Sequence, residues 1–319
     1  MSPEISTPEV VCRDASSGRR LARRNARFGP ANGVARKLCR DRSRAVCFAW
    51  LATFILIGIS IHARAADDER SVDQTSTTSD TSGPSPDEPS VTPYRPTVSN
   101  PADLSAPGWV EAEVGGLRSY NEDHSRNDNV PWLLKYAFDE NYGLLLGGGG
   151  YVSSQVPGAP SQASFGDTFL EWKQRFPVSD TAAFGVEAGV VAPTASHDLG
   201  AGKPQWLVNG IFSTDLGAMH LDVNLAETHG GDAPVHVSPW QTGWAAAISR
   251  PLAGNWGGAF ELSGIYQQGA ATQSQALFAL SYNWSRQLVL DCGAAYGLTH
   301  AAHDRSLFAG ATFLIGRLR

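Results

Sequence analysis

The stretch Met219-His220-Leu221-Asp222-Val223-Asn224-Leu225 has an apolar side chain at every odd position and a polar one at every even position. Successive side chains of a β-strand point to opposite faces, so this period of two indicates a strand with one apolar and one polar face. Segments 130–138, 168–176 and 184–190 alternate in the same way, and no convincing helical period interrupts them. The sequence beyond residue 108 therefore predicts an all-β structure.

Twelve such segments follow one another in the last two thirds of the chain. They lie near 109–118, 130–138, 142–151, 165–176, 181–192, 205–214, 218–227, 239–249, 256–266, 273–284, 288–297 and 306–317. Each is close to or slightly longer than the roughly nine to eleven residues that a tilted strand needs to cross a bilayer. This pattern predicts transmembrane strands.

The gaps between the predicted strands alternate in length. The odd-numbered gaps are mostly long (119–129, 152–164, 193–204, 228–238, 267–272, 298–305) and the even-numbered gaps are short (139–141, 177–180, 215–217, 250–255, 285–287). Outer-membrane barrels have short periplasmic turns and long extracellular loops, and an even strand count returns both termini to the short-turn side. We therefore predict a transmembrane antiparallel up-and-down β-barrel over 109–319, in the outer membrane of a Gram-negative bacterium, with both mature termini in the periplasm.

Aromatic residues concentrate near the predicted strand ends, on the apolar faces. They are Trp109, Trp132, Tyr142, Trp172, Phe176, Trp206, Trp240, Trp256, Tyr266, Tyr282, Trp284 and Tyr296. Amphipathic rings prefer the headgroup level, so these residues could form the two aromatic girdles of a barrel. The alternative is a soluble β-sandwich, in which the aromatics would point inward. The opposite faces carry mostly Gly, Ala, Ser and Gln with few charges, which favours an enclosed lumen.

The chain before the barrel has two parts. Residues 45–61 form an uncharged apolar run with a basic flank before it and Ala63-Arg64-Ala65 after it, as in a secretory signal peptide. We expect 1–65 to be a basic leader and signal peptide cleaved after Ala65, with an uncleaved transmembrane anchor as the alternative. Residues 66–108 are rich in Ser, Thr, Asp and Pro, and we expect a disordered acidic periplasmic tail, either a solvated linker or a tether to a periplasmic partner.

Composition excludes several classes of protein. The formal net charge is −6, and the basic residues gather in the leader, so nucleic acid is not expected as a partner. Of the four cysteines, only Cys292 lies beyond the leader, which excludes a disulfide scaffold and a four-thiolate zinc site. We expect no cofactor and no metal.

Ionisable residues on the faces opposite the apolar stripes are the candidate lumen-lining residues. They are Glu111, Glu113, Lys135, Asp167, Glu171, Lys173, Arg175, Glu187, His220, Asp222, Glu261 and Asp291. Such charges either pair across a narrow lumen as structural bracing or line a water-filled path that selects solutes by charge and size. Because the carboxylates outnumber the cations, a conducting lumen would have a weak cation preference.

A resemblance rests on four motifs. They are Gly166-Asp-Thr-Phe-Leu-Glu-Trp-Lys-Gln-Arg-Phe176, Ala183-Phe-Gly-Val-Glu-Ala-Gly-Val-Val-Ala-Pro-Thr194, Gly202-Lys-Pro-Gln-Trp-Leu-Val-Asn-Gly210 and Leu307-Phe-Ala-Gly-Ala-Thr-Phe313. Over roughly 109–319 the chain resembles the family named for the MetA pathway of phenol degradation. This resemblance implies an outer-membrane β-barrel that helps small, often aromatic, compounds across the membrane. It carries no catalytic or ligand residue over to this chain.

These observations predict a channel or transporter for passive passage of a small solute, such as an aromatic or hydrophobic one, gated by loops 152–164 and 193–204. The expected partners are outer-membrane lipids, lipopolysaccharide, the barrel-insertion machinery and the solute. A second hypothesis is an outer-membrane lipid hydrolase, using loop pairs such as His236-Val-Ser238, His197-Asp198, or His303-Asp304 near Ser306. A metal or ligand gate of loop histidines, and a closed structural or adhesive barrel with binding loops, are further alternatives.

Overall fold

A computed structural model describes residues 89–196, 199–231 and 233–318. The predicted signal peptide, 1–65, and the first part of the predicted tail, 66–88, lie outside the described residues. Among the residues that are described, no helix is long and apolar enough to cross a membrane.

Thirteen strands make up the described fold. They are β1 (Trp109–Tyr120), β2 (Arg126–Ala137), β3 (Tyr142–Gln155), β4 (Gln162–Ser164), β5 (Thr168–Ser179), β6 (Ala182–Ala192), β7 (Gln205–Leu216), β8 (Met219–Gly230), β9 (Trp240–Pro251), β10 (Trp256–Gln267), β11 (Gln273–Ser285), β12 (Leu288–Gly297) and β13 (Arg305–Arg317).

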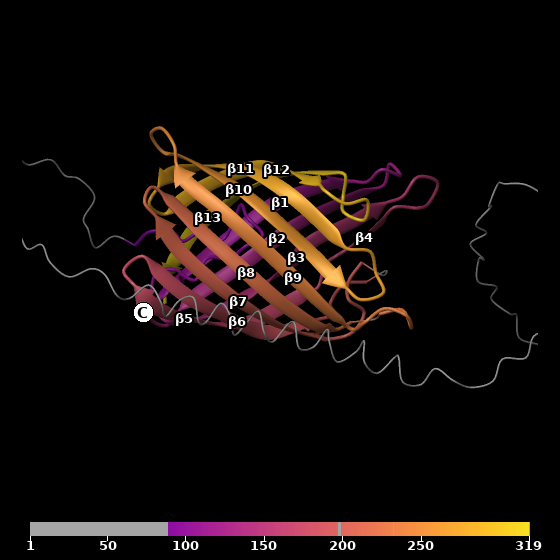
Figure 1. The fold of residues 1–319 in the computed structure, drawn as a ribbon, viewed down its shortest axis with the longest axis horizontal. Helices are drawn as coiled ribbons and strands as arrows, with labels where there is room; N and C mark the ends of the chain where they lie inside the picture. Colours follow the sequence, from indigo (N-terminus) through magenta and orange to yellow (C-terminus); the bar gives the residue numbers. More distant parts are fainter. Residues whose placement is uncertain (1–88, 197–198, 232, 319) are drawn as a thin grey trace, which may run out of the picture. The chain divides into compact units, whose positions relative to one another are not determined.

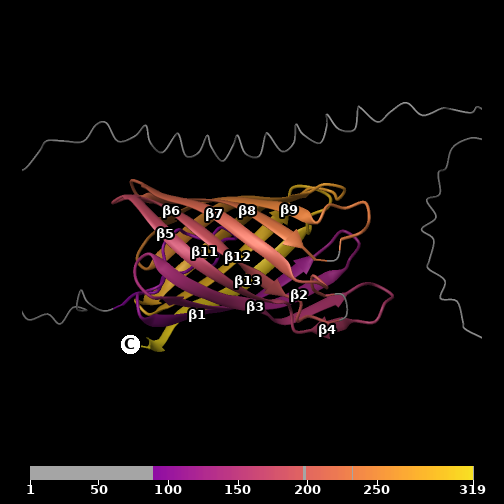
Figure 2. The ribbon, with the colours of Figure 1, turned by 90° about the horizontal axis from the view of Figure 1, so that it is seen from below.

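All strands except β4 form a closed antiparallel ring (Figure 1). Each strand pairs with its neighbour in sequence, β3 pairs with β5, and the ring closes where β1 pairs with β13. The short β4 pairs only with the end of β3 and extends the barrel wall beyond one rim (Figure 2). The structure confirms the predicted twelve-stranded up-and-down barrel, and β4 is an addition inside the predicted long loop 152–164.

The exposed fractions of the side chains along β6 show which face points outward. Val186 and Val190 are 39% and 36% exposed, whereas Glu187 between them is only 1% exposed. A soluble protein would bury the valines and expose the glutamate, so this arrangement is the inverse of a water-facing sheet. It matches a barrel with an apolar band outside and a polar interior.

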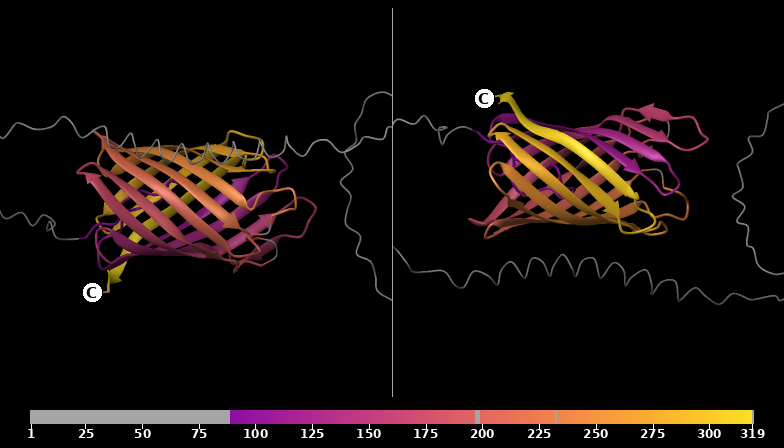
Figure 3. Two further views of the ribbon diagram at one scale, coloured as in Figure 1. Left: turned by 60° about the horizontal axis from the view of Figure 1, so that its bottom comes forward. Right: turned by 90° about the horizontal axis from the view of Figure 1, so that it is seen from above.

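The two ends of the barrel differ in the length of their connections. One end carries the short turns 138–141, 180–181, 217–218, 252–255 and 286–287. The other carries 121–125, 193–204, 231–239, 268–272, 298–304 and the hairpin with β4 (Figure 3). Within the two-residue turn between β7 and β8, Gly217 has a φ of 67°, a conformation that favours glycine. The predicted alternation holds, although β1 and β2 pair further than expected and shorten the first loop to 121–125.

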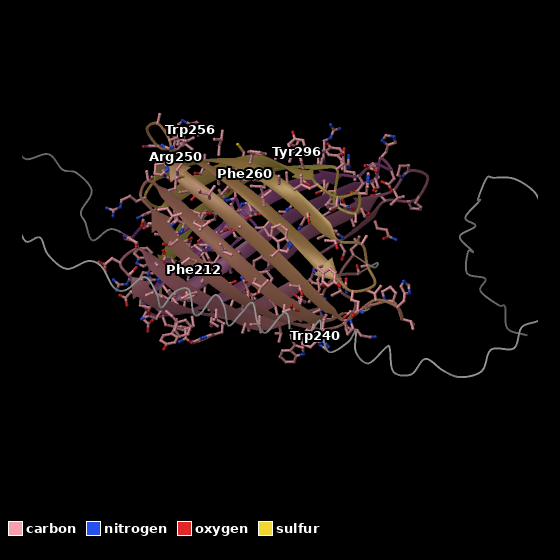
Figure 4. All side chains as sticks on the ribbon, in the orientation of Figure 1. Phe212, Trp240, Arg250, Trp256, Phe260 and Tyr296 are labelled. Carbon is pink, nitrogen blue, oxygen red and sulfur yellow. The ribbon has the colours of Figure 1, made fainter. Side chains whose placement is uncertain are left out.

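Outward aromatic side chains lie at both ends of the barrel. Figure 4 places Trp256 near the short-turn end, and Trp240 and Tyr296 towards the long-loop end. The rings of Trp256 and Tyr282 are tilted against each other with centroids 4.9 Å apart, and the ring centroids of Trp240 and His229 are 4.4 Å apart. Rings at these two levels are suited to the two headgroup regions of a bilayer.

Candidate functional site: a lumen occupied by the chain itself

The lumen contains residues 89–105, which we call the plug. The described chain begins at the short-turn end, where the C-terminus also lies (Figures 1 and 3). Val91 N donates to the carbonyl of Arg286, in the turn between β11 and β12. After the plug, Gly108 N donates to the carbonyl of Ala137, again at the short-turn end. Between these points the plug contacts the inner wall of the barrel.

The expectation of a disordered tail therefore does not hold for residues 89–108. The composition of this segment shows that it cannot form an apolar core of its own. It is instead ordered by polar partners that distant strands supply, which composition alone does not reveal.

The start of the plug binds a buried cluster on β1 and β2. Thr92 N donates to Glu111 Oε2 at 3.0 Å, and Tyr94 N donates to Glu113 Oε1 at 2.8 Å. Lys135 Nζ lies 2.6 Å from Glu111 Oε1 and 2.5 Å from Glu113 Oε1. The same ammonium group donates to Thr92 O at 2.5 Å. This cluster pairs its buried charges and hydrogen-bonds the plug backbone, as buried ionised groups require.

The Tyr94 ring lies between two lysines of the barrel wall. Lys135 Nζ is 3.9 Å and Lys173 Nζ 4.0 Å from the ring centroid, within the range of cation–π interactions. The Tyr94 hydroxyl donates to Asp103 O at 3.0 Å, which joins two parts of the plug. Burial, followed by the nearby carboxylate of Glu187, raises the pKa of Tyr94, so the hydroxyl stays protonated and available as a donor.

A second buried pair, from β5 and β6, binds the far part of the plug. Lys173 Nζ lies 3.0 Å from Glu187 Oε1 and donates to Pro101 O at 2.6 Å. Asn100 Nδ2 donates to both carboxylate oxygens of Glu187, at 3.1 and 2.9 Å. Asn209 Nδ2 on β7 completes the set with a 2.9 Å bond to Glu187 Oε2. Every charge of this pair thus has a partner within the lumen.

The deepest part of the plug reaches the middle of β8 and β10. Glu261 Oε2 accepts hydrogen bonds from Val98 N at 2.9 Å, Ser99 N at 2.8 Å and Ser99 Oγ at 3.0 Å. Asn224 exchanges two hydrogen bonds with the backbone of Asn100, each 2.8 Å long. The paired bonds of Asn224 resemble the ladder of a β-sheet, with a side-chain amide replacing one backbone.

Three further contacts join the plug to the barrel wall. Arg95 forms a double hydrogen bond with Asp291 on β12, and Arg175 Nε donates to Asp103 Oδ1 at 2.7 Å. Ala102 is fully buried and packs against Ala183 and Ile211, one of the few apolar contacts of the plug.

Eight of the twelve residues predicted to line the lumen contact the plug directly. They are Glu111, Glu113, Lys135, Lys173, Arg175, Glu187, Glu261 and Asp291. Glu171 is buried on the same face of β5 as Lys173. His220 Nε2 lies 3.1 Å from Asp222 Oδ1, and both residues line the cavity at the short-turn end.

Asp167 differs from the other predicted residues. It precedes β5, and its two carboxylate oxygens accept hydrogen bonds from Ala195 N at 3.0 Å and Ala201 N at 2.6 Å. It therefore fixes the long loop 193–204. The sequence did not predict the plug, nor the amide and hydroxyl residues Asn209, Asn224 and Ser213, of which Ser213 Oγ accepts a hydrogen bond from Ala102 N at 2.8 Å. One feature of the sequence could have indicated the plug. Arg95 is the only cation in residues 89–108, and the predicted inner faces of the strands carry more carboxylates than cations.

The plug separates two cavities. One, of about 430 Å³, opens towards the long loops and has Val98 of the plug in its wall. The other, of about 640 Å³, lies towards the short turns, and Thr92, Thr97 and Pro101 of the plug line it. Both volumes fall within the range of small-molecule sites.

The pairs considered for hydrolysis or metal binding have other partners. His303 Nδ1 lies 2.5 Å from Asn121 Oδ1, and Ser306 Oγ is hydrogen-bonded to Ser119 Oγ at 2.8 Å. His197 and Asp198 lie outside the described residues. The described part of the chain holds no group of three or more His, Cys, Asp or Glu arranged for a metal ion.

No family model matches the sequence, and no curated relative matches it. Among solved structures, an outer-membrane channel from Pseudomonas putida F1 has a TM-score of 0.53 at 13% identity, covering 67% of this chain and 98% of that chain. A KdgM porin in complex with disordered oligogalacturonate has a TM-score of 0.41 at 9% identity, covering 63% and 98%. A NanC porin has a TM-score of 0.45 at 9% identity, covering 64% and 98%.

The likeness to the Pseudomonas channel defines the class of fold. The fold is a twelve-stranded barrel of the kind found in the outer membrane, shared with the Pseudomonas channel. At this level of identity the likeness extends to the fold alone.

Proposed function

We propose that the protein is an outer-membrane channel whose lumen is closed by its own plug, and that small solutes pass when the plug leaves the barrel. The short turns face the periplasm in this proposal, so the plug enters from the periplasmic side and both mature termini lie there. The outward aromatic rings contact outer-membrane lipids and lipopolysaccharide. The single observation that carries the proposal is a continuous polar segment lying in the lumen with a cavity on either side of it.

The chemistry of the plug contacts supports a removable closure. Its partners are mostly carboxylate, ammonium and amide groups, which water can hydrate once the plug has left. Displacing the plug would join the two cavities into a continuous path.

In this proposal the gate is the plug, and not the long loops 152–164 and 193–204 that the sequence suggested. Loop 193–204 is fixed to the rim by Asp167, whereas the plug crosses the lumen itself. The path left behind would carry more carboxylates than cations, so we keep the expectation of a weak cation preference. Reversal potentials of the open state in planar bilayers measure it, and a clear anion preference would contradict it.

A disulfide between the plug and the wall tests the gate. A Cβ built at Gly185 lies 3.4 Å from Ala102 Cβ, close to the roughly 3.5–4.5 Å of natural disulfides. The variant combines Ala102→Cys and Gly185→Cys in a Cys292→Ala background, because Cys292 is the free cysteine of the described residues. We expect oxidised protein in planar bilayers to show no openings and reduction to restore those of the parent protein.

Each single cysteine variant is the control, since it changes the same side chains without a crosslink. Equal conductance in the oxidised and reduced double variant would show that the plug is not the gate. A barrel that stays silent after reduction, and also when plug contacts are removed by mutation, would indicate the closed structural alternative.

A further inference from the structure

The cavity on the long-loop side of the plug, which we call the outer cavity, is lined by uncharged polar groups together with apolar side chains such as Trp244 and Ile265. Its volume is about 430 Å³. The amide and hydroxyl residues in its wall include Asn209, Asn224, Thr228, Gln241, Gln273 and Gln275. Side-chain amides offer both donors and acceptors, and hydroxyl groups can act as either. The wall is therefore matched to a solute that also carries groups of both kinds.

The outer cavity carries no formal charge at neutral pH. His303 is the one ionisable residue in its lining, and burial lowers the pKa of this histidine. His303 Nδ1 also faces Asn121 Oδ1, which suits a neutral ring that donates from Nδ1. The charged pairs of the lumen lie against the plug instead. An ionised solute entering this cavity would lose hydration without gaining a counter-charge.

One buried acceptor in the wall lacks a partner. Asn209 Nδ2 donates to Glu187 Oε2 and to Asn224 Oδ1, which fixes the orientation of the amide. Asn209 Oδ1 is then left as a buried oxygen without a hydrogen bond, in a side chain that is only 7% exposed. This oxygen is itself covered by protein atoms, so the hydrogen-bonding groups that a solute in the cavity can reach are those of half-buried or exposed residues such as Thr228, Gln241, Gln273 and Gln275.

We propose that the outer cavity is a binding site for a neutral solute with several hydroxyl groups, of the sugar class. Hydroxyl groups can both donate to and accept from the amides of Gln241, Gln273 and Gln275. An aromatic or hydrophobic solute would leave these groups unpaired, which sites built for hydrogen bonding penalise strongly. The solute class therefore differs from the one that the family resemblance implies. The proposal rests on the proposed function for its biological role, because the cavity is then the entrance of the channel.

Saturation-transfer NMR on the folded full-length mature chain in detergent tests the proposal. Maltose, phenol and benzoate are added separately at equal concentration. We expect saturation transfer to maltose and none to phenol or benzoate beyond that of empty detergent micelles. Transfer to either aromatic solute without transfer to maltose would overturn the proposal.

Variants on one face of β11 locate the binding. Gln275 and Asn283 are both amides on the lumen face of this strand, but Gln275 lines the outer cavity and Asn283 the short-turn cavity. We expect Gln275→Leu to weaken maltose binding about fivefold, the effect of losing one hydrogen bond, and Asn283→Leu to leave it unchanged. Equal losses in the two variants would overturn the location.

A second variant distinguishes the loss of a solute contact from misfolding of the barrel wall. Gln275 Nε2 donates to Ser263 Oγ, so Gln275→Leu can disturb the wall, whereas Thr228→Val changes only one hydroxyl at nearly constant shape. We expect weaker maltose binding in Thr228→Val as well, with the parent's shift in gel mobility on heating. Binding is measured without conduction, so a silent barrel that binds maltose would refute the proposed function alone. A barrel that conducts but shows no binding of maltose would refute only this inference.

Discussion

The guanidinium of Arg95 binds the carboxylate of Asp291 through two parallel hydrogen bonds, Nη2 to Oδ1 at 3.0 Å and Nε to Oδ2 at 3.1 Å. The two residues are 196 positions apart in sequence, one in the plug and one on β12. Bidentate pairs of this kind are the strongest common side-chain hydrogen bonds and also fix orientation. Arg95 is the plug's only basic residue, so this is the one bond in which the plug supplies the positive charge.

Replacing Asp291 should therefore open the channel more often. Asp291→Asn keeps the size of the side chain but loses the charge and one of the two acceptors. Hydrogen bonds to charged groups are worth about 1.5–3 kcal/mol, so we expect the ratio of open to closed states to rise roughly 10- to 100-fold. Open probability in planar bilayers measures the change.

Asp128→Asn is the matched control for this experiment. Asp128 on β2 pairs with Arg118 on the neighbouring β1 and with Arg126 on its own strand, and no hydrogen bond or ion pair joins it to the described plug. We expect its open probability to equal that of the parent protein. An Asp291→Asn channel as closed as the control would show that this pair does not hold the plug.

The space for Arg95 comes from glycine in the barrel wall, which gives a second prediction. A Cβ at Gly115 would lie 2.5 Å from Arg95 Cζ and 2.6 Å from both Nη atoms, too close for the guanidinium to stay in place. The adjacent Gly116 has nothing within 4 Å of the corresponding position. We expect Gly115→Ala to raise the open probability and Gly116→Ala to leave it unchanged.

A double variant separates this mechanism from general damage to the strand. If Gly115→Ala acts through Arg95, adding Arg95→Ala should have little further effect, because the interaction is already lost. Additive effects of the two changes would mean that Gly115→Ala acts elsewhere, and heat modifiability of each variant reports whether the barrel remains folded.

The barrel was predictable because its signals are local. The alternation of Met219 to Leu225 sets the two faces of β8, and the short turns are set by a few residues such as Gly217. The membrane orientation of the faces follows from the same period, since Val186 and Glu187 are adjacent in sequence and on opposite sides of the wall. Each of these inferences needs only a window of about ten residues.

The plug was not predictable because its stabilising partners are remote in sequence. Ser99 binds Glu261, 162 residues away, and nothing in the composition of the tail indicates this contact. Period two places Glu261 and Asp291 on the polar face of their strands, but it says nothing of what they bind. Asp167 lies before the first residue of β5, where the alternation of the strand no longer applies, and it binds a loop instead.

The position of Tyr94 between Lys135 and Lys173 gives a third prediction. Tyr94→Phe keeps both ring faces and loses only the hydroxyl bond to Asp103 O, whereas Tyr94→Leu removes both cation–π contacts. Desolvated contacts of this type are worth up to about 2 kcal/mol each, and a neutral hydrogen bond about 1 kcal/mol. We expect hydrogen exchange at the Tyr94 and Ser99 amides to accelerate at least tenfold in Tyr94→Leu and about fivefold or less in Tyr94→Phe. Both amides are hydrogen-bonded to wall carboxylates, so their exchange reports departure of the plug. Equal acceleration in the two variants would assign the attachment to the hydroxyl group and remove the ring between the lysines from the mechanism.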